Sequence, residues 1–269
     1  MDRYRLKNII ILILVLVNLF LVGSLAIRET SRRSARRTAA EQLVALFAAD
    51  GIALDPAAVS GETPPAARTL LRDTALERQA AAALLGNHLS RSDQGGGITT
   101  YSSSQGAALF RASGSFDASG TLARTDAVDF CRAFCKEFRY EEPVFQMDGT
   151  GSGTATVTRL YDGFPVFNCT VTFTIETGVL TAVSGTLLPE TDAETDTETQ
   201  PLSAAAALTA FQQMRRETGA VVSSVTGMDR CFELQSSPAV AMSLVPAWRI
   251  VTNTKEYYVN CQTGAVTSS

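Results

Sequence analysis

The chain contains a single histidine, His88, among its 269 residues. A metal site built from several histidines is therefore excluded, and no local signature supports a cysteine–histidine nucleophile pair. His88 lies in a Gly-Asn-His-Leu-Ser stretch that is typical of a helix end or an exposed loop. Walker loops, the Gly-x-Ser-x-Gly elbow and the His-Glu-x-x-His motif are also missing. We predict no catalytic, cofactor-binding or metal-binding residue, and an enzyme would have to work with carboxylates alone.

Charged and aromatic residues are scarce, at 19% and 7% of the chain, and there is one tryptophan, Trp248. A net charge of -4 gives no indication of nucleic acid as a partner. Trp248 lies in the segment Pro-Ala-Trp-Arg-Ile, which favours a role in the core over a ligand platform.

The chain has five cysteines, and an odd number does not indicate a full disulfide framework. Cys131 and Cys135 are four residues apart and share one face of a predicted helix with apolar residues. Cys169 alternates with apolar residues, from Phe167 to Ile175, on the predicted buried side of a strand. These three are interpreted as small buried residues rather than metal or redox groups. For Cys231 and Cys261 a disulfide between the two is an alternative to free thiols.

One long apolar run is present, from Ile9 to Ile27, after a short basic N-terminus. At about 1.5 Å per residue it forms a helix of roughly 28 Å, which is enough to cross the hydrocarbon core of a membrane. A cleaved signal peptide ending at Ser24-Leu25-Ala26 is the alternative, but the run is longer than a usual signal core. We predict an uncleaved single-pass helix. Asn18 lies in its middle, where a polar side chain seeks a partner on another helix.

Basic residues flank both ends of this run. Three precede it, and five arginines follow it between residues 28 and 37. A literal count of positive charges would place the C-terminal part in the cytoplasm, whereas long domains translocate largely regardless of charge. We interpret the arginine cluster as a clamp on lipid phosphates. Residues 1–8 are then a cytoplasmic tail, and residues 9–27 the transmembrane helix.

The rest of the chain predicts an α+β fold. Residues 28–120 form an N-terminal α+β region. The elements expected there are helices over 28–49 and 72–85 with an extended piece at 51–54 between them, a loop over 90–97, and strands over 98–101 and 107–115.

Two further segments, 121–188 and 202–269, each predict one helix followed by an antiparallel meander. Asp126 and Ser203 are the expected helix caps. Thr177-Gly178 and Thr263-Gly264 are the expected hairpin turns, with glycine supplying a positive φ. The predicted elements are a helix to 138 and strands over 154–161, 164–175 and 179–188, then a helix to 217 and strands over 221–225, 231–235, 240–252, 256–261 and 265–267. A helix covers one face of each sheet and leaves the other free.

Residues 189–201 differ from both flanking segments. They are acidic, repetitive and free of large apolar side chains, so they cannot bury enough surface to fold. A calcium loop is the alternative, but the spacing and glycine of an EF-hand are missing. We interpret this segment as an acidic linker.

Several short motifs resemble the YycI/YycH family. The N-terminus has Met-Asp, basic residues and an apolar helix that contains Asn18-Leu19-Phe20-Leu21. The C-terminal half has the strand Trp248-Arg249-Ile250 and the hairpin sequence Tyr-Val-Asn-Cys-Gln-Thr-Gly over 258–264. The resemblance is to YycI more than to the longer YycH, and the repeated segments are also similar to PepSY-type modules.

The resemblance implies a membrane protein with its large domain outside the cell, which modulates the sensor histidine kinase of a two-component system. Its partners would be the transmembrane region of the kinase, a YycH-like sister protein and the membrane, and it could form a homodimer or heterodimer. Partner binding by the anchor would involve Asn18, Phe20 and Gly23. The alternative is a PepSY-like extracellular inhibitor or binder of a protease or cell-wall polymer.

Overall fold

The structure is a computed structural model that describes residues 14, 17, 18, 38–59, 62–122, 126–190, 192–196, 200–236 and 241–268. The predicted α+β class is confirmed, because four α-helices in this part of the chain accompany a 15-stranded mixed sheet. Of the predicted transmembrane helix, residues 14, 17 and 18 are described, and all three are helical. Within the described ranges we find no helix with the length and apolar character needed to span a membrane.

The helices begin and end near the residues that the sequence predicts. Asp73, Asp126 and Ser203 each accept a hydrogen bond from a first-turn N–H, as N-cap residues do. Gly219 ends the last helix in the left-handed conformation. The bounds are 38–49 for the first helix, then Thr74–Leu85 (α2), Ala127–Glu137 (α3) and Ala204–Thr218 (α4), with a 3-10 turn at Pro56–Ala58 (η1).

Each of α2, α3 and α4 is followed by antiparallel strands, and we call these groups the first, second and third units. The first unit has β3 (Ser90–Gly95), β4 (Ile98–Ser103), β5 (Gly106–Arg111) and β6 (Ser115–Gly120). The second has β7 (Gln146–Met147), β8 (Gly153–Tyr161), β9 (Phe164–Glu176) and β10 (Val179–Thr186). The third has β12 (Ser224–Ser236), β13 (Ala241–Thr252), β14 (Glu256–Asn260) and β15 (Val266–Ser268). The sequence predicts this order twice, and it occurs three times.

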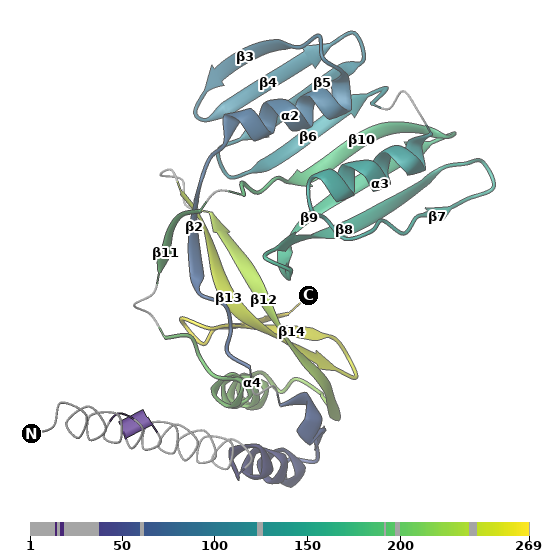
Figure 1. The fold of residues 1–269 in the computed structure, drawn as a ribbon. Coiled ribbons are helices and arrows are strands. Elements are labelled where there is room, and N and C mark those ends of the chain that lie inside the picture. The colour runs from purple at the N-terminus through teal and green to yellow at the C-terminus, as the bar shows by residue number, and fades with distance from the viewer. Residues whose placement is uncertain are drawn as a thin grey trace, which may run out of the picture.

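All three units contribute to one sheet. Strands β6 and β10 pair antiparallel, so the first two units are continuous, and α2 and α3 lie on the same face (Figure 1). Strands β9 and β12 meet in parallel at Val166 and Phe232. Beside this contact the Asn168 side chain bonds both backbone groups of Leu234, donating at 2.8 Å and accepting at 2.7 Å. The Asn168 side chain therefore lengthens the short parallel pairing by which the second and third units are joined.

The third unit is completed by segments from the N-terminal part of the chain. Strand β1 (Ala53–Leu54) pairs parallel with β12, and β2 (Ala67–Leu71) pairs antiparallel with β13. The helix over 38–49 packs against α4, where the rings of Phe47 and Phe211 stack with centroids 6.3 Å apart. Residues far apart in sequence therefore share one core.

Two segments expected to be irregular are strands. Residues 90–97 were predicted as a loop, but Ser90–Gly95 forms β3, an edge strand whose side chains are all exposed. Residues 189–201 were predicted as a linker, but Asp192–Asp196 forms β11, which pairs antiparallel with β2. The predictions were wrong because an edge strand is held by backbone hydrogen bonds and needs no apolar alternation.

Two other predictions placed strand boundaries wrongly. The strands expected over 221–225 and 231–235 are one strand, β12, whose register shifts between Val225 and Gly227 and so interrupts the alternation. The strand expected over 107–115 is divided into β5 and β6 by a turn at Gly114, where φ is +84°. Residues 28–37 of the first predicted helix lie outside the described residues.

Candidate functional site

The sheet of the third unit has one face covered by α4 and one face free of it. On the covered face the indole of Trp248 is fully buried, and its N–H donates to the carbonyl of Leu202 at 2.9 Å. The core role predicted for Trp248 is confirmed. The neighbouring residues Ala247 and Tyr258 belong to a separate cluster with Phe167 on the opposite side.

A pocket of about 90 Å³ opens on this second side, which we call the uncovered face. A cavity of about 10–15 Å³ holds a single water molecule, so this pocket has room for several water-sized groups. Its lining combines two aromatic rings, amides, hydroxyls and one carboxylate. The lining residues are Phe167, Glu233, Gln235, Ala247, Tyr258, Asn260, Thr263, Ala265 and Thr267.

An aromatic pair lines one part of the pocket. The rings of Phe167 (β9) and Tyr258 (β14) stack nearly parallel, with centroids 3.8 Å apart and planes 13° apart. Ring quadrupoles favour offset or edge-to-face pairs over a face-to-face stack, so the surrounding strands must hold this arrangement. Phe167 was predicted on the same buried side as Cys169. That prediction was wrong, because the pairing of β8 with β9 shifts between Thr158 and Arg159.

A fixed amide lines another part of the pocket. The side-chain oxygen of Asn260 accepts from the backbone N–H groups of Gln262 and Thr263, at 2.9 and 3.0 Å. Because backbone N–H groups can only donate, the side-chain atom of Asn260 that faces them must be its oxygen. The amide nitrogen of Asn260 therefore points toward Glu233. It donates to the carboxylate oxygen Oε2 of Glu233 at 2.6 Å. Gln235 donates to the same oxygen at 3.2 Å.

Beside the pocket the charges are paired. Arg249 forms an ion pair with Glu256, and its other terminal nitrogen lies 4.0 Å from Asp229. The hydrogen bond from Arg249 lowers the pKa of Glu256, and a bond from the Tyr258 hydroxyl adds to this effect. Burial, followed by the bond to Glu256, raises the pKa of Tyr258. Glu256 is therefore ionised and Tyr258 neutral at pH 7.

The C-terminal hairpin motif builds much of this site. Tyr258 supplies a ring, Asn260 supplies the fixed amide, and Thr263-Gly264 closes the turn with φ +73° at the glycine. In the sequence this motif carries the family resemblance but has no feature that indicates a pocket. Phe167 and Glu233 were missed, because they come from strands whose register with β14 cannot be read from the sequence.

Of the anchor residues predicted for partner binding, only Asn18 is described, and it is not among the residues that line this pocket. Asn18 is helical and exposed. Phe20 and Gly23 lie outside the described residues.

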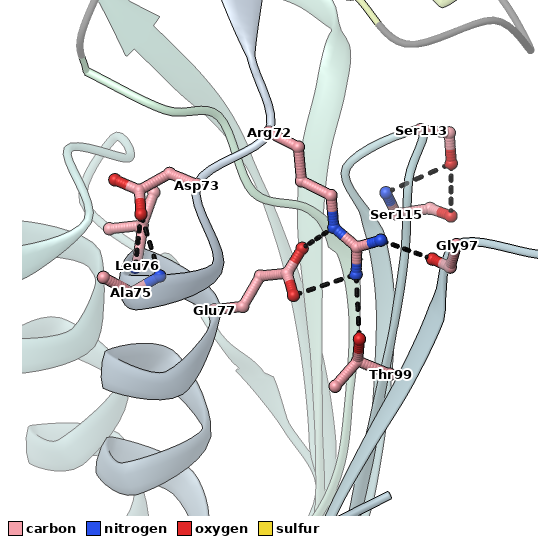
Figure 2. Close-up of polar contacts among 9 residues, drawn as sticks. All are labelled: Arg72, Asp73, Ala75, Leu76, Glu77, Gly97, Thr99, Ser113 and Ser115. Carbon is pink, nitrogen blue, oxygen red and sulfur yellow. Dashed lines mark hydrogen bonds and ion pairs between the residues drawn. The ribbon is translucent and has the colours of Figure 1, made fainter. Parts of the chain in front are cut away.

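A second polar cluster joins the third unit to the first, where the chain passes from β2 into α2 (Figure 2). Arg72 donates from Nε and a terminal nitrogen to both carboxylate oxygens of Glu77, at 2.6 and 3.0 Å. Its remaining bonds go to the carbonyl of Gly97 at 2.7 Å and the hydroxyl of Thr99 at 3.1 Å. All three guanidinium nitrogens are used within the chain, so this cluster is a structural junction rather than a ligand site.

Burial makes the thiols poor nucleophiles at neutral pH. All five cysteines are free and buried, including Cys231 and Cys261, between which no disulfide is formed. Burial raises the pKa of Cys131, Cys135, Cys169 and Cys261 to about 12. Reaction requires the thiolate, which is negligible when the pKa is so high. Among the described residues no cluster of three or more His, Cys, Asp or Glu side chains forms a metal site.

Comparisons with known proteins give structural similarities only. No family model matches the chain, and no curated protein matches it by sequence. An uncharacterized protein from Eubacterium rectale is similar in structure, with 12% identity, a TM-score of 0.44, and coverage of 77% of this chain and 86% of that chain. The C-terminal domain of YpeB from Bacillus megaterium is also similar, with 14% identity, a TM-score of 0.35, and coverage of 74% and 98%. Similarity at this level transfers no ligand and no activity to the chain.

Proposed function

We propose that the chain is a membrane-anchored, non-enzymatic binding protein with PepSY-like units. Its uncovered face would hold an extracellular partner, a protease or a cell-wall polymer. The observation that carries this proposal is the pocket beside Phe167 and Tyr258, which presents rings, hydroxyls and a carboxylate to solvent. Convergent polar groups in a concave site are typical of ligand recognition. The buried thiols and the lone exposed His88 support binding rather than covalent chemistry.

Filling the pocket tests this proposal. Ala265 is an exposed lining residue, and we expect Ala265→Trp to place an indole in the opening and weaken partner binding about tenfold or more. The measurement is retention of the full chain, in detergent micelles, on purified cell-wall polymer, together with inhibition of secreted proteases. Ala107→Trp is the matched control, because Ala107 is an exposed alanine on the sheet of the first unit. Equal partner binding by both variants and the parent would exclude the uncovered face as the partner-binding site.

Regulation of a sensor histidine kinase through the anchor is the second candidate. The observation that favours it is the docking of the helix over 38–49, which connects toward the predicted transmembrane segment. Ile52 and Gly51 donate to the carbonyls of Phe47 and Ala48, at 2.9 and 3.0 Å. Gly51 has φ +74°, so the helix ends in a Schellman motif that turns the chain into β1.

An ionic contact fixes the same helix end to α4. The carboxylate oxygen Oδ2 of Asp50 accepts from Arg215 at 3.0 Å, from Arg216 at 2.9 Å, and from Gln212. The hydrogen bond from Arg216 lowers the pKa of Asp50 below its ordinary value of 3.8, and the contact from Arg215 contributes further. Movement of the third unit would therefore be transmitted to the helix over 38–49.

Asp50→Asn tests this coupling. An amide carries no charge to hold two arginines, so we expect faster hydrogen exchange in residues 40–50 and altered signalling in cells. Because the pKa is lowered in the folded state, the contribution of Asp50 is full above about pH 3.8 and is lost only as the pH falls through the folded-state pKa. Glu217→Gln on α4 is the control. Unchanged exchange and signalling in Asp50→Asn would remove the contact from the mechanism.

A further inference from the structure

The carboxylate of Glu233 differs from the other acids of the uncovered face. Glu256 and Asp229 share Arg249 as a basic partner. Within the described residues no lysine, arginine or histidine lies within ion-pair distance of Glu233, and its hydrogen bonds come from two neutral amides. A partly buried carboxylate that lines a pocket without a counter-charge favours a positively charged ligand.

We infer that this pocket binds an organic ammonium group, with Glu233 as its counter-ion and the Phe167–Tyr258 pair beside it. The inference rests on the proposed function and specifies its ligand. Aromatic rings attract cations over their faces, so an outer face of the stacked ring pair and the carboxylate select the same charge. An anion would be repelled by Glu233.

A metal ion fits this pocket less well than an organic cation. Among the described residues of the lining Glu233 is the only carboxylate, and both of its hydrogen-bond donors there are N–H groups that occupy Oε2. Hard cations such as Ca²⁺ need about six to eight oxygen ligands, often from several carboxylates.

The hydrogen bonds also favour ammonium over guanidinium. A carboxylate offers about two acceptor sites on each oxygen, and both sites of Oε2 are taken by Asn260 and Gln235. A guanidinium binds best across both oxygens in one plane, which these two donors obstruct. In the described part of the chain Oε1 accepts no bond and can take one N–H of an ammonium. The hydroxyls of Thr263 and Thr267, also in the lining, can accept the others.

The test uses the full chain in detergent micelles and the probe Nα-acetyl-lysine-N-methylamide, titrated by saturation-transfer NMR. We expect the probe to bind, its Nε-acetylated form to bind at least about tenfold more weakly, and the corresponding arginine probe to bind more weakly than lysine. Glu233→Gln should weaken lysine-probe binding about tenfold while keeping an acceptor for Asn260, with an unchanged unfolding midpoint. Glu176→Gln, an exposed acid at the end of β9, should bind as the parent does.

Equal binding of the charged and acetylated probes, or equal binding by Glu233→Gln and the parent, would overturn the inference. Acetylating the amino groups of the cell-wall polymer distinguishes the two sources. Loss of retention assigns the ligand to the polymer, whereas unchanged retention together with protease inhibition that Glu233→Gln abolishes assigns it to a lysine side chain. If the probe binds through Glu233 but Ala265→Trp retains its partner, the site stands and the proposed function fails. If Ala265→Trp loses the partner and Glu233→Gln does not, the ammonium assignment fails.

Discussion

Replacing Trp248 with alanine is expected to lower the free energy of unfolding by about 3–5 kcal/mol, the usual range for a large buried aromatic residue. Trp248 is fully buried among residues of α4, β14 and the helix over 38–49, so alanine would leave a cavity in a core that joins distant segments. The substitution also leaves the carbonyl of Leu202 without its indole donor. Denaturant unfolding of the full chain in micelles, followed by circular dichroism, measures the loss.

Trp248→Phe separates the contribution of the buried ring from that of the hydrogen bond to Leu202. It retains most of the buried apolar surface but removes the hydrogen bond, so we expect a smaller loss, between about 1 and 3 kcal/mol. A loss below about 1 kcal/mol for Trp248→Ala would show that the third unit does not depend on this core.

Glu77→Ala is expected to cost about 3 kcal/mol, because it leaves the charge of Arg72 without its partner at the junction in Figure 2. The Glu77 side chain is only 7% exposed and that of Arg72 is 21% exposed, so water compensates poorly for the lost pair. Loss of this hydrogen bond lowers the pKa of Arg72 back toward its ordinary value, which is still far above neutral pH, so Arg72 stays charged after the substitution. Thermal and denaturant unfolding measure the effect.

Asp117→Ala is the matched control. The Arg111–Asp117 pair has the same 2.6 Å separation but is exposed at 43% and 57%. Exposed pairs are worth about 1 kcal/mol or less. If both substitutions cost the same, burial of the Arg72–Glu77 pair contributes nothing to stability.

Helices and hairpin turns could be predicted from the sequence because their signals are local. Asp126 and Ser203 are caps as expected, and the glycines of Thr177-Gly178 and Thr263-Gly264 adopt positive φ. Strands β8, β9 and β10 follow apolar alternation and match the predicted bounds within a few residues.

The pairing between units could not be predicted in this way. Strand β11 is polar and is held at an edge by backbone bonds, and β3 has no buried face to produce alternation. The pocket depends on the register that places Phe167 beside Tyr258, 91 positions later in the sequence. That register follows from the irregularity in β9 and from the single parallel contact with β12, for which the sequence has no local signal.

The assembly of the third unit from both ends of the chain has a consequence for folding during synthesis. The first two units share a core whose residues all lie between Leu76 and Leu187, so these units can fold as soon as that part of the chain emerges. The helix over 38–49 and strands β1 and β2 emerge earlier, but their partners α4, β12 and β13 come last. Contacts over such sequence separations form slowly. Until the final hairpin is made, the helix over 38–49 lacks the core that buries Leu43 and Phe47, so these apolar side chains are open to a chaperone.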